Sequence, residues 1–203
     1  GGKNMSTHSK RTVEGNQLVS LDNPRLRIQI APELNYLGNL KTITLNDVSI
    51  DNYYFVHQTE AGNIRRILYF QFEASNNDHI LNYPTMQTIK INDHPFVYDG
   101  GVRPYRASKI EEQAVASDVR KTVDFLSEQG VHFQEGELYG ALRFAHQFDD
   151  AKQKDMLIIY LEHVYEADVP ADVIAKSRYS DEWQPYCDQL IARALRTFTI
   201  CED

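Results

Sequence analysis

The first hundred residues contain a succession of short segments in which apolar and polar side chains alternate. In residues 25–30, "RLRIQI", every second residue is apolar, which is the period of a half-buried β-strand. Comparable segments follow at 53–58, 64–74 and 86–91. The turn sequence "TEAGN" joins the first two of these and is typical of a hairpin. The spacing predicts an antiparallel meander of strands in the N-terminal half.

The pattern changes to helical spacing after residue 106. Ser108 and Glu111 match a capping box, and Ser117 is a second candidate N-cap. Gly130 then supplies a stop signal. Apolar residues at helical spacing predict three helices, over residues 117–130, 137–148 and 180–196.

The segment 156–165, "MLIIYLEHVY", is apolar on all sides and rich in β-branched and aromatic residues. This composition predicts a central strand covered on both faces. The alternative is a continuation of the preceding helix. Strands followed by helices, with a late strand returning to the sheet, indicate an α+β fold. We expect a mainly antiparallel sheet packed by the three C-terminal helices, and the alternative is a closed β-barrel with helical additions.

The length of 203 residues suits one domain, which we expect to span residues 18–203. Residues 1–17 are polar and read as a tail. A leading Gly-Gly with Met5 internal fits either an expression remnant or a chain whose signal was removed. Cys187 and Cys201 are compatible with one disulfide or with two separate thiols. These features, with the acidic charge, lean toward an exported protein.

The formal charge of −8 repels phosphate backbones, so we expect no nucleic-acid partner. No apolar run is long enough to predict a membrane span. The sequence lacks the phosphate-binding, dinucleotide-binding, serine-hydrolase and zinc motifs. Three H-x-x-E patterns occur, but they fall where strands and turns are expected, so they predict no metal site. We therefore predict neither a cofactor nor a metal.

A candidate ligand-binding surface comes from the strand at 64–74. Its Leu68, Phe70 and Phe72 form a core side, and the opposite side is unusually polar. If this strand, the strand at 156–165 and the strand at 25–30 are neighbours, their polar residues share one surface. That set is Arg27, Tyr69, Gln71, Glu73, Tyr160 and Glu162. If other elements cover this surface, it is a pocket for a small ligand; if they do not, it is the solvent-exposed face of a sheet.

Two functions fit this surface. The first is a non-enzymatic module that binds a small molecule or a protein. The second is a hydrolase in which Glu73 and Glu162 act as paired carboxylates. The hydrolase requires one of these glutamates to lie within hydrogen-bond reach of a second titratable group in a deep pocket. The ring-rich segments "NYYFVH" and "HILNYPTM" form either a partner-binding rim or the end of the core.

Overall fold

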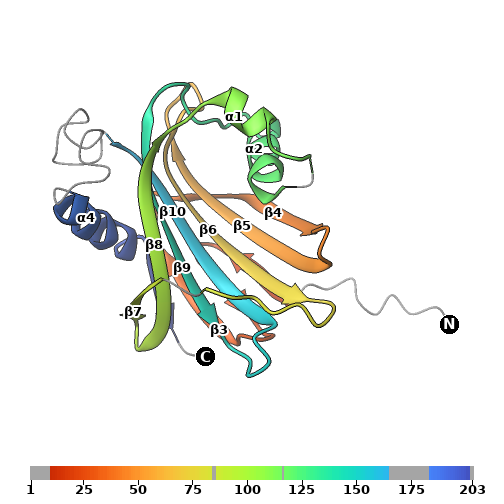
Figure 1. Cartoon of the computed structure of the whole chain (residues 1–203). Helices are drawn as coiled ribbons and strands as arrows, with labels where there is room; N and C mark the ends of the chain where they lie inside the picture. The colour runs from red at the N-terminus through yellow and green to blue at the C-terminus, as the bar shows by residue number, and fades with distance from the viewer. Residues whose placement is uncertain (1–9, 84–85, 116, 165–182, 202–203) are drawn as a thin grey trace.

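The computed structural model of the chain describes residues 10–83, 86–115, 117–164 and 183–201. Two antiparallel sheets dominate it (Figure 1). The larger has seven strands in the order β4 (Asn35–Ile43), β5 (Val48–Gln58), β6 (Ile64–Ser75), β10 (Lys154–His163), β9 (Leu138–Gln147), β8 (His94–Pro104) and β7 (Gln87–Ile91). The smaller has four, in the order β1 (Arg11–Glu14), β2 (Gln17–Ser20), β3 (Leu26–Ile30) and β11 (Phe198–Cys201).

The small sheet packs on one face of the large sheet, which we call the outer face. Leu68, Phe70 and Phe72 of β6 lie on this face and are buried against residues of the small sheet. The rings of Phe70 and Phe198 meet edge to face at 5.9 Å across the two sheets. The side of β6 that the sequence assigned to the core is therefore confirmed as core.

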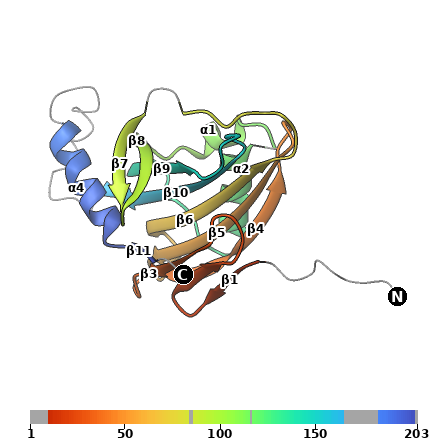
Figure 2. The same cartoon turned by 90° about the horizontal axis from the view of Figure 1, so that it is seen from below.

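Helix α4 (Trp183–Leu195) also covers part of the outer face, beside the small sheet (Figure 2). Its Tyr186, Leu190 and Ala194 are buried in the same cluster. Gly140 of β9 permits this approach, because the Tyr186 hydroxyl occupies the space that a Cβ there would need. Pro185 lies in the first turn of α4, where no helical N–H is required.

The opposite, inner face of the large sheet is partly covered by α2 (Asp118–Glu128), which follows the short helix α1 (Ala107–Glu111) (Figure 1). The Ser117 hydroxyl caps α2 by accepting from the N–H of Arg120 at 3.2 Å. Leu126 is buried against the sheet, and the ring of Phe125 stacks on Tyr54 at 5.1 Å. The predicted N-cap at Ser117 is thus confirmed.

Several expectations about the elements have clear outcomes. The late strand is confirmed, since β10 is the middle strand of the seven; Tyr165, its expected last residue, lies outside the described residues. The helix expected at 137–148 is wrong, because this segment forms β9 between β8 and β10. Residues 11–14, expected in a tail, form β1 and pair with β2. The capping box at Ser108 is wrong, because the N-cap of α1 is Arg106 and has no side-chain cap.

The α+β character is supported, and the two sheets stay separate in the described chain, so the barrel alternative is wrong. Among the described helices, none combines the length and apolarity that crossing a membrane requires.

Candidate functional site

Two carboxyl groups from neighbouring strands lie together on the inner face of the large sheet. The register places Asp155 of β10 directly opposite Glu73 of β6. Their side chains share a hydrogen bond, and the Gln71 amide donates a second one to Glu73. Asp155 is fully buried, whereas Glu73 is partly exposed. This carboxyl pair, Glu73 with Asp155, is the centre of the candidate site.

A segment that follows β6 covers the buried member of the pair. The Tyr83 hydroxyl donates to Oδ2 of Asp155 at 2.5 Å. The side chain of Leu81 packs with Val48 and Ile50 on the inner face. The Gln147 amide donates to the Leu81 carbonyl, which ties this segment to β9. Tyr83 is therefore held over Asp155 by contacts to strands on both sides of it.

The surroundings of the pair favour a bound proton. Burial, followed by the charge of the adjacent Glu73, raises the pKa of Asp155 to about 8. Burial also raises the pKa of Glu73. When Asp155 is ionised, its Oδ1 is buried and has no donor among the described groups. A proton held between the two carboxyls removes this deficit, so geometry and electrostatics agree on a protonated pair.

The inner face around the pair carries aromatic, acidic and basic side chains. Burial raises the pKa of Tyr69 well above its usual value, and the hydroxyl faces the charges of Asp118 and Arg143. Burial also raises the pKa of Asp118, which begins α2. Arg143 of β9 is 45% exposed, lies 3.5 Å from Asp99, and has its guanidinium 5.8 Å from the Tyr83 ring. The surface thus offers rings, carboxyls and one cation within a short distance.

The six residues predicted to share a surface lie in three places. Tyr69, Gln71 and Glu73 do lie together on the inner face, which α2 and the segment before β7 partly cover. Arg27 lies on the small sheet, where it donates to Gln17 at 3.3 Å. Tyr160 and Glu162 lie on the outer face, because the register places Tyr160 opposite Leu68. The expectation of one common surface is therefore wrong.

Glu162 belongs to a buried network under α4. Arg193 of α4 donates from Nε to both carboxylate oxygens of Glu162 at 2.9 Å, and its Nη2 forms an ion pair with Oε2 at 2.8 Å. The Tyr160 hydroxyl donates to the same carboxylate at 2.9 Å. Glu162 is fully buried and Arg193 is 17% exposed. The arrangement is a charge-assisted attachment of α4 to the sheet rather than a surface for a ligand.

The structure also places the two cysteines and the ring-rich segment "NYYFVH". Cys187 and Cys201 are free thiols, one buried in α4 and one exposed on β11, so the disulfide alternative is wrong in this structure. Burial raises the pKa of the Cys187 thiol to about 11. Tyr53, Tyr54 and Phe55 of the segment "NYYFVH" are all buried, so its rings belong to the core and not to a rim.

Sequence reasoning missed Asp155, Tyr83 and Arg143. Asp155 lies one residue before the apolar run that predicted β10, and nothing local shows that Glu73 is its partner. Tyr83 is in an irregular segment, and Arg143 is in a segment expected to be helical. The acid at the start of an apolar strand was the available signal, but its meaning depends on the pairing of strands far apart in sequence.

Within the described residues, no group of three or more His, Cys, Asp or Glu side chains is arranged to hold a metal ion. Comparison with protein-family models, with curated proteins and with solved structures gave no match.

Proposed function

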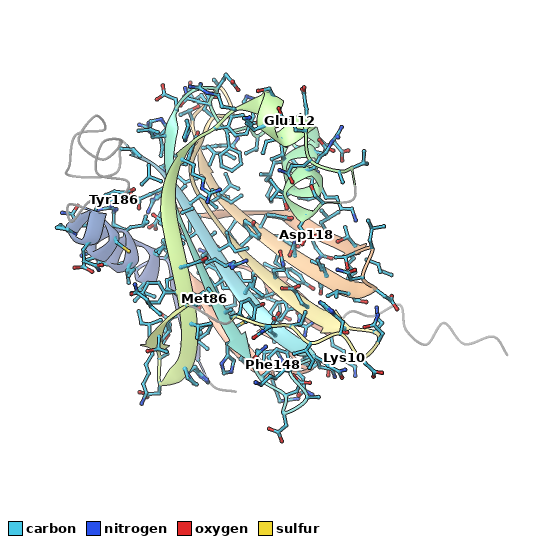
Figure 3. The ribbon with its side chains drawn as sticks, viewed as in Figure 1. Lys10, Met86, Glu112, Asp118, Phe148 and Tyr186 are labelled. Carbon is cyan, nitrogen blue, oxygen red and sulfur yellow. The ribbon has the colours of Figure 1, made fainter. Side chains whose placement is uncertain are left out.

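We propose that this chain is a small-molecule-binding module whose ligand lies on the inner face of the large sheet, against Tyr69 and within hydrogen-bond reach of Glu73 and Gln71. The observation that carries the proposal is that this polar face is covered at both ends and left partly open between them. Figure 3 shows Asp118 of α2 to one side of this face and Met86, just before β7, to the other. Tyr69 and Glu73 remain partly accessible between these covers.

The chemistry of the face indicates the kind of ligand. Three carboxyl groups on this face have raised pKa values, those of Glu73, Asp155 and Asp118. The charge of Arg143 acts on Glu73 and Asp155, and that of Lys121 acts on Asp118. Arg143 already forms an ion pair with Asp99, so its positive charge does not fully offset the negative charge of the carboxyl groups on this face. A ligand that presents hydrogen-bond donors, such as an amine or a polyol, would stabilise these carboxyl groups. Its apolar part would lie on the ring of Tyr69.

A screen by protein-observed NMR tests this proposal. Sets of small amines, polyols and carboxylates are added to the labelled chain, and we expect the first two sets to shift the amide signals of Tyr69, Gln71 and Glu73. In Glu73→Gln, binding should weaken by roughly tenfold or more, since a hydrogen bond to a charged group is lost. Glu128→Gln, on the exposed side of α2, is the matched control. Full binding by the Glu73→Gln variant would sink the proposal.

The proton held by the carboxyl pair favours a second candidate, acid–base hydrolysis. Two carboxyls that share one proton can activate a water and protonate a leaving group. The enzyme hypothesis required a glutamate next to a second titratable group, and Glu73 next to Asp155 meets that part of it. If chromogenic ester or amide substrates are turned over, Asp155→Asn should lower the rate by about 10²-fold or more. Unchanged turnover in that variant would exclude this candidate.

A further inference from the structure

A second concavity, separate from the carboxyl pair, lies at the corner where the small sheet meets strands β4, β5, β6 and β10. We call it the corner cavity. Its volume is about 530 Å³, within the range of small-molecule sites. Arg11, Asp22 and Asn23 form the wall on the side of the small sheet, and residues of the four large-sheet strands form the floor and the opposite wall.

The strand register decides which side chains face this cavity. Lys41 lies opposite Asp51, and Asp51 lies opposite Phe72, so these three share the outer face. The same holds for the row that runs from Ile43 to Lys154 through Ser49 and Ala74. Glu73 borders the cavity between these rows but points to the inner face. The corner cavity and the carboxyl pair therefore lie on opposite faces of one sheet.

The floor of the corner cavity is apolar and partly aromatic. The guanidinium of Arg11 lies 3.9 Å from the centre of the Phe72 ring, which gives a flat wall. Phe148 lines the cavity as well. Ile43, at the end of β4, is 62% exposed, an unusual exposure for a large apolar side chain beside a cavity. These surfaces suit a planar apolar body.

The charge on the rim differs from that of the whole chain. Arg11 is 3.7 Å from Asp51 and donates to Ser20 and to the Asn23 carbonyl, so its charge is largely used within the fold. Lys41 and Lys154 are exposed and form no ion pair within the described residues. Asp22 and Asp51 are the acids that face the cavity, and Glu73 borders it while pointing to the inner face. The lining therefore holds three bases and three acids, a balanced set in a chain of net charge −8.

From this combination we propose that the corner cavity binds a small organic anion with a planar apolar body. The body lies on the apolar floor at Phe72, and the acidic group pairs with Lys41 or Lys154, which lie on strands at opposite sides of that floor. This site is independent of the inner-face function, since the two lie on opposite sides of the sheet.

The probe for this site is 1-anilinonaphthalene-8-sulfonate, and N-phenyl-1-naphthylamine serves as its uncharged analogue. Titration calorimetry of the full chain should give one sulfonate per chain, with weaker binding of the uncharged analogue. The double variant Lys41→Gln/Lys154→Gln should weaken sulfonate binding at least fivefold and leave binding of the analogue unchanged. Lys90→Gln, an exposed lysine on β7, is the matched control.

A second variant, Ala74→Trp, fills the floor of the cavity and should abolish binding of both probes. Circular dichroism checks that it folds, and if it does not, the lysine variants alone decide. Sulfonate affinity that is unchanged in the double lysine variant overturns the proposal, and so does binding without a one-to-one stoichiometry. The inner face is tested with amines and polyols and the corner cavity with the sulfonate, so failure of one proposal is distinguishable from failure of the other.

Discussion

Asp155 shows how one buried side chain links structure to pH. Its neutral form suits its position, because the ionised form leaves an oxygen without a donor in the described structure. An acid whose pKa is raised in the folded state binds more protons there than in the unfolded chain. Such a group makes the folded state less stable as pH rises from its unfolded pKa, near 4, to its folded pKa of about 8.

We therefore expect the free energy of unfolding to fall across this interval, by up to about 1.4 kcal/mol per pH unit for one proton. In Asp155→Asn, which keeps a neutral side chain of the same shape, the fall should be clearly shallower. Urea denaturation at pH 4.5, 6 and 7.5 measures both. Asp150→Asn, in an exposed turn, should keep the full slope. An identical slope in wild type and Asp155→Asn would show that Asp155 does not carry the effect.

At the scale of elements, β10 serves two different purposes with its two faces. Asp155 and Ile159 belong to the inner face, whereas Tyr160 and Glu162 belong to the outer face and hold α4. The local sequence predicted the strand and its burial on both faces but not this division. In β9, apolar residues recur at helical spacing, at Leu138, Leu142 and Ala145. The segment nevertheless forms a strand, because it pairs with β8 on one side and β10 on the other.

The attachment of α4 gives a prediction at this scale. Arg193→Ala leaves Glu162 charged, buried and without its main partner, so we expect a loss of about 3 kcal/mol in the free energy of unfolding. Arg193→Met with Glu162→Met should recover a large part of that loss, because no buried charge remains. Arg196→Ala, exposed just after the same helix, should cost less than about 0.5 kcal/mol. Urea denaturation compares the three, and equal stability of Arg193→Ala and Arg196→Ala would contradict the structural role.

For the whole molecule, the sequence was informative about what each strand buries and poor about which strands meet. The α+β character, the core side of β6 and the late central strand follow from local patterns. The inner-face site does not, because β6 pairs with β10, about eighty residues further along the chain, in a register that no local pattern contains. A shift of one residue would have brought Tyr160 to the face of Tyr69, as the sequence reasoning assumed.

The carboxyl pair is the central feature of this structure, and a titration of the side-chain carboxyl ¹³C signals tests it most directly. Asp155→Asn assigns the signal of Asp155. The structure predicts a midpoint of about 8 for Asp155 and a raised midpoint for Glu73, with the Asp155 midpoint moving downward in Glu73→Gln as the neighbouring charge is removed. A midpoint near 4 for Asp155, the same in wild type and in Glu73→Gln, would contradict the shared proton and the site built on it.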